Sequence, residues 1–210
     1  HVLDARRIDF WNLTAENNGA SPSATVEEQA GLYYFESNNV ESASGDVRCR
    51  NCSISGSTGQ GVLAVNSVDL WLEGLHLEDN NPTMPAFEVD NGDTMPGGAS
   101  GRVQVTNAHV EAETPGQPAV KFHRAAVEVN GLTMAGNHSG LEWRGDNNGQ
   151  FPSYLNNSVL SGTQCVLLEG HPSLNGHGNR ISSACTGSIT LTDSQVNWSG
   201  PVSYTHLRAH

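Results

Sequence analysis

The chain has 210 residues, enough for one domain with a sizeable core, and only 15% of them are charged. The formal net charge is −12, and Lys121 is the only lysine. A surface of this sign repels polyanions. It argues against nucleic acids and anionic membranes as partners, and against acidic polysaccharides unless a local arginine cluster overrides the field.

The first thirty residues stand outside the repeat that dominates the sequence, and we expect residues 1–30 to form an incomplete N-terminal coil or cap. The chain opens at His1 rather than at an initiator Met. Residues 201–210 break the preceding pattern and resemble a translated sequencing adapter. We therefore expect a foreign tail there, and a natural protein that is longer at both ends.

An eight-residue motif recurs between residues 31 and 200. It reads apolar, any, apolar, any, then Gly, Asn or Asp, two variable residues and a final apolar residue. The alternation places one face of a short strand in a core, and the fifth position calls for a residue that tolerates positive φ. The copies are VRCRNCSI (47–54), LWLEGLHL (70–77), VQVTNAHV (103–110), VEVNGLTM (127–134), SYLNNSVL (153–160) and ITLTDSQV (189–196).

A second motif alternates with the first and reads small, apolar, any, apolar, polar. We expect its two apolar positions to point inward. The expected inward pairs are Tyr33/Phe35, Leu63/Val65, Phe87/Val89, Val120/Phe122, Leu141/Trp143 and Val166/Leu168.

Two strand types that alternate at a period of about 25 residues predict an all-β solenoid, because stacked coils align equivalent residues. Sandwiches and meander barrels do not need this fixed order, and propeller blades are longer. We predict a right-handed single-stranded parallel β-helix of about six to seven coils over residues 31–200.

Two places in the repeat are longer than the rest. One lies around residues 90–98, and the other runs from His171 to roughly Ser188. Long inserts in a regular coil are loops on one face, where binding usually resides.

The four cysteines form two pairs that are close in sequence, Cys49 with Cys52 and Cys165 with Cys185. Local pairing fits disulfides in an oxidising compartment, and a disulfide between Cys165 and Cys185 would pin the second insert. Small buried thiols are the alternative. A zinc site is disfavoured because the C-x-x-C has neither a second pair nor nearby histidines.

Arg144-Gly145-Asp146 follows the inward Trp143, and we expect it on an exposed turn. An Arg-Gly-Asp tripeptide on a tight turn is what integrins recognise, although Gly and Asp also suit any turn. These three residues are the one binding site that the sequence suggests.

Three further patterns carry less chemistry. Gly176-His177-Gly178 downstream of Cys165 resembles the polygalacturonase family, but Thr163 and Gln164 stand where that family has paired aspartates. Glu88, Asp90 and Asp93 offer too few oxygens for calcium, and Arg102 stands alone as a base for a lyase. His76 and His109 should stack on neighbouring coils and point outward. No metal, cofactor or complete catalytic set is predicted.

The sequence resembles passenger domains of pertactin-like bacterial autotransporters in three features. These are the alternation of the two motifs, the scarcity of lysine and the run Leu191-Thr192-Asp193-Ser194-Gln195-Val196-Asn197-Trp198-Ser199-Gly200. This resemblance implies a secreted or surface-displayed stalk of a Gram-negative outer membrane, which supports adhesion to a host-cell surface protein or glycan through loops between coils. The four cysteines depart from the family, whose passengers contain few.

Three hypotheses follow from the sequence. The first is a non-enzymatic adhesin-like binding stalk. The second is a polysaccharide lyase or glycoside hydrolase of the pectin-degrading β-helix type, with an active site largely outside this chain. The third is a structural repeat without a ligand. Carboxylates clustered on one face of the coil would favour the enzyme. Exposed aromatic residues and polar loops without such a cluster would favour binding, and a smooth face of stacked Thr, Ser and Asn with disordered loops would favour the structural repeat.

Overall fold

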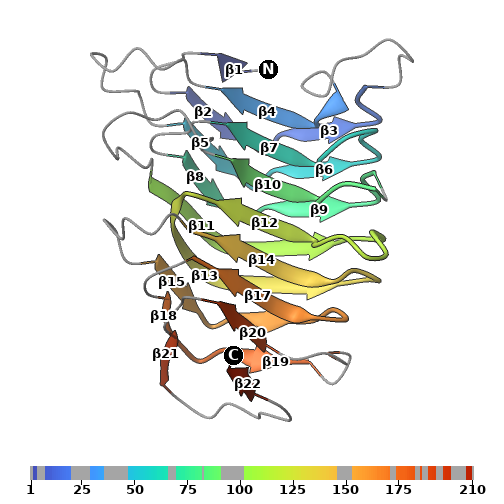
Figure 1. Cartoon of the computed structure of the whole chain (residues 1–210). Coiled ribbons are helices and arrows are strands. Elements are labelled where there is room, and N and C mark those ends of the chain that lie inside the picture. The colour runs from blue at the N-terminus through green and yellow to red at the C-terminus, as the bar shows by residue number, and fades with distance from the viewer. Residues whose placement is uncertain are drawn as a thin grey trace.

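The computed structural model describes residues 2–3, 8–19, 29–35, 47–65, 70–81, 83–90, 102–145, 153–170, 174–182, 185, 189–192, 196–199 and 207–209. Within these residues the chain is all-β, and its strands run parallel in two long sheets (Figure 1). The described residues include no helix that is long and apolar enough to cross a membrane.

Strands of the second motif form sheet A, in which each strand pairs with its counterparts in the neighbouring repeats. Described residues contribute nine strands in the order β1 (Val2–Leu3), β4 (Leu32–Phe35), β7 (Val62–Val65), β10 (Phe87–Asp90), β12 (Val120–His123), β14 (Gly140–Arg144), β17 (Cys165–Glu169), β20 (Ile189–Thr192) and β22 (Leu207–Ala209).

Strands of the first motif form sheet B. The first half of the motif gives β2 (Ile8–Trp11), β5 (Val47–Arg50), β8 (Leu70–Glu73), β15 (Ser153–Asn156), β18 (Leu174–His177) and β21 (Val196–Ser199). The second half gives β3 (Thr14–Glu16), β6 (Ser53–Ser55), β9 (His76–Glu78), β16 (Val159–Leu160) and β19 (Arg180–Ile181). In β11 (Arg102–Glu111) and β13 (Ala126–Ala135) both halves form one bent strand.

The fifth position of the first motif adopts positive φ, as its composition predicts. The position holds Asn51, Asn107 and Asn157 at φ 53°, 54° and 49°, and Gly74 and Gly131 at φ 65° and 82°. Asn and Gly tolerate this left-handed conformation, which redirects the chain between the two halves of the motif. Asp193, the equivalent residue of the last predicted copy, lies outside the described residues.

The asparagines at these turns also reach across to the adjacent repeat. Asn51 Nδ2 donates to Asn12 Oδ1 at 3.3 Å, and Asn157 Nδ2 donates to Asn130 Oδ1 at 2.9 Å. A Cβ built on Gly74 would lie 2.7 Å from Asn51 Oδ1. The absence of a side chain at Gly74 therefore leaves room for the side-chain amide of Asn51 in the adjacent repeat.

The main core lies between the inward faces of the two sheets and runs the length of the stack. Aromatic rings from successive strands of sheet A meet edge to face within it. The centroid distance is 5.4 Å between Phe87 and Phe122 and 4.9 Å between Phe122 and Trp143. Trp143 is fully buried, in agreement with its predicted inward position.

The expected inward pairs Leu63/Val65 and Tyr33/Phe35 were wrong by one residue. Leu63 pairs in register with Glu88, and Val62 with Phe87, so the outward column contains Leu63 and the inward column contains Val62. Tyr33 aligns with Leu63 in the outward column, where both join a separate small apolar cluster with Ala30. These strands are apolar throughout, so alternation cannot choose a face and the register with neighbouring strands decides it.

The predicted insert between His171 and Ser188 was also wrong in part. Residues 174–181 form β18 and β19, a further copy of the first motif with Gly178 at the fifth position (φ 66°). The repeat pattern does not reveal this copy, because Gly176 replaces the apolar residue at its third position. Consequently Ile189–Thr192 belongs to sheet A as β20, and ITLTDSQV is not a copy of the first motif.

Alanine at Gly74 and at Gly116 separates the cost of positive φ from the cost of a steric contact. Gly116 has φ 79°, and a Cβ there would meet nothing within 4 Å. We expect Gly116→Ala to lower the free energy of unfolding by about 1 kcal/mol. Gly74→Ala adds the contact with Asn51 and should lower it by roughly 1 kcal/mol more. Urea unfolding measures both, and equal losses would contradict a role for the Asn51 amide.

Candidate functional sites on the two sheet faces

The outer surface of sheet A carries a cluster of alternating charges, which we call the charged face. It comprises Glu88, Asp90, Lys121, His123, Glu142, Arg144 and Glu169 on β10, β12, β14 and β17. Two columns run across these strands: Glu88 aligns with Lys121 and Glu142, and Asp90 aligns with His123, Arg144 and Glu169. The sequence shows the individual residues, but only the parallel register brings them together.

Each carboxylate of the charged face contacts a basic side chain. Lys121 Nζ lies 2.6 Å from Glu88 Oε1, and His123 Nδ1 lies 3.0 Å from Asp90 Oδ1. Glu88 is nearly buried and also accepts a hydrogen bond from Gln60 Nε2 at 2.8 Å. Pairing across strands at this spacing stabilises a sheet surface, so the pairs have a structural role whatever else they do.

Arg144 connects two carboxylates of the charged face. Its Nε lies 2.8 Å from Glu142 Oε1 and 3.4 Å from Glu169 Oε2. The two carboxylate oxygens are therefore no more than about 6 Å apart, since both lie against the same nitrogen atom. Retaining glycosidases hold their two carboxyl groups at about 5–5.5 Å, which makes this pair the strongest catalytic candidate among the described residues.

The predicted Arg-Gly-Asp site has a different setting from the one that the sequence suggests. Arg144 is the last residue of β14 rather than part of a turn, and its guanidinium contacts Glu142 and Glu169. Gly145 donates its backbone N–H to the carbonyl of Glu169 at 2.9 Å. Asp146 lies outside the described residues. The arginine thus belongs to the charged face.

A second surface carries exposed aromatic side chains, and we call it the aromatic face. It lies on the strands of sheet B that the first half of the motif forms. It comprises Asp9, Trp11, Arg48, Arg50, Trp71, Glu73, Gln104, Thr106, Glu128, Asn130, Tyr154 and Asn156. The large hydrophobic side chains exposed in the described part of the chain are Trp11 (60%), Trp71 (37%) and Tyr154 (39%), and all three lie here.

Two tryptophans of the aromatic face are held against arginines from β5. Arg48 Cζ lies 4.3 Å from the centre of the Trp71 ring, and Arg50 Cζ lies 4.5 Å from the centre of the Trp11 ring. Arg50 Nε is also 3.5 Å from Glu73 Oε2. Cation–π stacking of this kind attracts the guanidinium to the ring and restricts the ring's motion. The tryptophans are consequently fixed while remaining open to solvent.

Both predicted cysteine pairs are joined in the structure. Disulfides link Cys49 to Cys52 and Cys165 to Cys185, with Cα–Cα distances of 5.9 and 5.6 Å. No cysteine is free. Cys49 and Cys52 are buried in the core on either side of the turn at Asn51.

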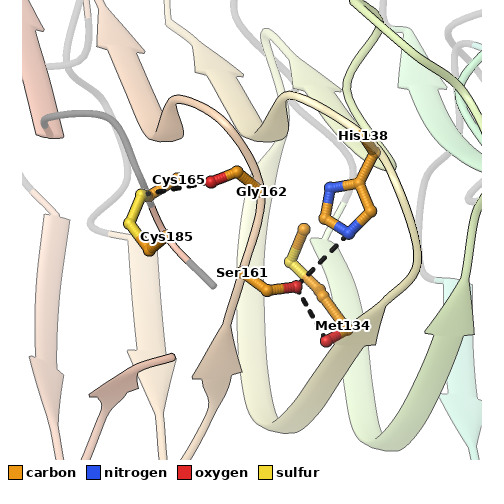
Figure 2. The surroundings of a disulfide bond; sticks show 6 residues. All are labelled: Met134, His138, Ser161, Gly162, Cys165 and Cys185. Carbon is orange, nitrogen blue, oxygen red and sulfur yellow. Dashed lines mark hydrogen bonds between the residues drawn. A yellow bond between two sulfur atoms is a disulfide. The ribbon is translucent and has the colours of Figure 1, made fainter. Parts of the chain in front are cut away.

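A histidine and a serine meet in the interior next to the second disulfide. Figure 2 shows His138 and Ser161 pointing toward each other, and Ser161 Oγ lies 3.3 Å from His138 Nε2. Both side chains are buried. Ser161 donates its one hydroxyl proton to the carbonyl of Met134 at 2.9 Å, so His138 Nε2 must be the donor to Ser161. A histidine that donates here cannot take the serine proton, so the pair is structural.

Burial lowers the pKa of His138 below its usual value, because a charged imidazole loses its hydration in the interior. A hydrogen bond with the backbone of Ala135 and the charge of Glu113 oppose this shift in part. Burial therefore favours the neutral imidazole. Neither this histidine nor Ser161 was identified from the sequence, since neither belongs to a motif.

The remaining sequence candidates do not form sites within the described residues. His76 and His109 stack as predicted, with ring centroids 5.1 Å apart, and His76 Nε2 lies 3.2 Å from Glu78 Oε2. Among the residues that the structure describes, no group of three metal-binding side chains could hold an ion. Glu88 and Asp90 are engaged by Lys121 and His123, and Asp93 lies outside the described residues.

Comparisons of the chain with protein-family models, with curated proteins and with solved structures find no match. The two sheet faces are therefore interpreted from their own chemistry.

The lowered pKa of His138 predicts a loss of stability in acid. Between its folded pKa and about 6.5 the unfolded chain binds more protons, so stability is full above pH 6.5 and falls as the pH drops through this interval. The slope is at most about 1.4 kcal/mol per pH unit. His138→Gln keeps a donor to Ser161 and should remove this component of the slope, as measured by urea unfolding from pH 5 to 8.

His177→Gln serves as the control for this prediction, because His177 is exposed on β18. The control should keep the acid-dependent loss of the parent chain. An identical pH profile for the parent and His138→Gln would show that His138 does not titrate in this range.

Proposed function

We propose that the protein is a right-handed single-stranded parallel β-helix that acts as a secreted, adhesin-like stalk and binds glycans. The fold proposal rests on the strict alternation of the chain between sheets A and B and on in-register parallel pairing within each sheet. Right-handed crossovers are the rule for parallel strands, which supports the handedness.

The two disulfides support secretion. Disulfides persist in oxidising compartments and are rare in the cytosol, and all four cysteines are paired here.

The autotransporter origin is a further part of the proposal and rests on the style of the repeat alone. A genomic clone extending past residue 210 tests it: a downstream translocator barrel supports this origin, and a complete gene without one removes it.

The aromatic face carries the proposal of glycan binding. Exposed aromatic rings are unfavourable in water, and the confinement of the three exposed rings to one surface supports the proposal of an interaction site there. Gln104 and Glu128 lie in register between Trp71 and Tyr154. Rings that contact the apolar faces of sugars, with amide and carboxylate groups for the hydroxyls between them, are suited to a polyhydroxylated ligand.

Removal of one ring should weaken glycan binding without unfolding the protein. Trp71→Ala and Tyr154→Ala should each lower the affinity for a retained polysaccharide by about tenfold, because each loses one desolvated aromatic contact. Affinity gel electrophoresis with a panel of soluble polysaccharides measures the effect. Thr133→Ala is the control, since Thr133 is exposed on the second half of β13. Retention that survives both aromatic substitutions would contradict the proposal.

A second candidate function is glycoside hydrolysis on the charged face. The observation in its favour is the approach of Glu142 and Glu169 to the same Arg144 nitrogen. Hydrolysis needs one carboxyl group that carries a proton and one that does not. Both groups here are partners of a cation, which suits ion pairs better than a proton donor. Binding is for this reason the better supported function.

Release of reducing sugar from neutral polysaccharides tests this second candidate. If the charged face is catalytic, Glu169→Gln should lower the rate by at least about 100-fold. Glu73→Gln is the matched control, because Glu73 also pairs with an arginine but lies on sheet B. Absence of turnover across the panel removes the candidate.

A further inference from the structure

We infer that the aromatic face selects an uncharged, extended, β-1,4-linked polysaccharide whose chain runs across the strands, from Trp71 toward Tyr154. This inference rests on the proposed glycan binding and names its ligand class. Three features support it: the spacing of the aromatic rings, the polar residues between them and the local balance of charge.

The spacing of the rings follows from the register of sheet B. One column runs across β5, β8, β11, β13 and β15, and it contains Arg48, Trp71, Gln104, Glu128 and Tyr154 in that order. Trp71 and Tyr154 are thus three strand spacings apart, about 14 Å. An extended β-1,4-linked glycan advances per sugar by nearly the distance between adjacent strands. Such a chain, laid along the column, places one sugar over each residue.

The residues between the two rings can bind sugar hydroxyls. Gln104 offers an amide and Glu128 a carboxylate, and their side chains lie side by side with Gln104 Nε2 3.5 Å from Glu128 Oε2. Thr106 and Asn130 flank them in the adjacent column. An α-1,4-linked glycan coils, so it could contact one ring but would leave the straight column before reaching the second.

The charges of the aromatic face argue against an acidic glycan. Two arginines, Arg48 and Arg50, stand against three carboxylates, Asp9, Glu73 and Glu128. Arg50 already contacts Glu73. The arginine cluster that could have overridden the net charge of −12 is therefore neutralised locally. A neutral ligand avoids the repulsion that a uronate or sulfate would meet.

Isothermal titration with pentasaccharides of matched length tests the inference on the full chain. Cellopentaose should bind at least about tenfold more tightly than maltopentaose or pentagalacturonate. Its affinity should change little with salt and should rise with length from the disaccharide to the pentasaccharide. Trp71→Ala and Tyr154→Ala should each weaken it about tenfold, while the control Thr133→Ala, at an exposed position on the second half of β13 and outside the aromatic face, should stay within about twofold.

The remaining outcomes separate this inference from the proposed function. A preference for maltopentaose or pentagalacturonate that is lost in Trp71→Ala overturns the inference and leaves glycan binding intact. Cellopentaose binding that is unaffected by Trp71→Ala overturns the placement on the aromatic face. Failure to bind any oligosaccharide or polysaccharide overturns both, provided that the circular dichroism spectrum shows a folded β protein.

Discussion

In-register parallel pairing between successive repeats is the constraint on which the rest of the structure depends. Each strand pairs with the equivalent strand of the preceding and following repeat, so equivalent residues form columns across the sheets. Inward columns fill the core, as where Val62 aligns with Phe87. Outward columns gather side chains that are about 25 residues apart in sequence. The charged face and the aromatic face both arise in this way.

The same stacking imposes requirements on the turns. At the fifth position of the first motif the chain takes positive φ, and only residues without a costly Cβ conflict, or with a short amide, fit there. Asn51 and Asn157 use their side chains to bind the adjacent repeat, and Gly74 leaves space for such an amide. The residue type at this turn is thus restricted by its positive φ and by the side chain at the turn of the adjacent repeat.

The two faces differ in how their side chains are satisfied. On the charged face the acids and bases pair with one another, and the surface is stabilised without a ligand. On the aromatic face the tryptophan rings stack with arginines and yet stay open to water. The proposal of glycan binding by sheet B rests on this exposure. His138 is buried in the interior, and the two disulfides join cysteines that lie in or against the core.

The sequence by itself determined the strand types, their alternation and the positive-φ turns, because these depend on local alternation and on Asn or Gly at a fixed position. It also predicted the stacking of His76 and His109. Only the tertiary structure decided which face of β7 points inward, because Val62 to Val65 are all apolar and the register alone distinguishes them. It likewise revealed the copy at 174–181, where Gly176 hides the pattern, and it moved Arg144 from a turn into the charged face. The alignment of Trp71 with Tyr154 depends on the lengths of the intervening turns, which no local pattern encodes.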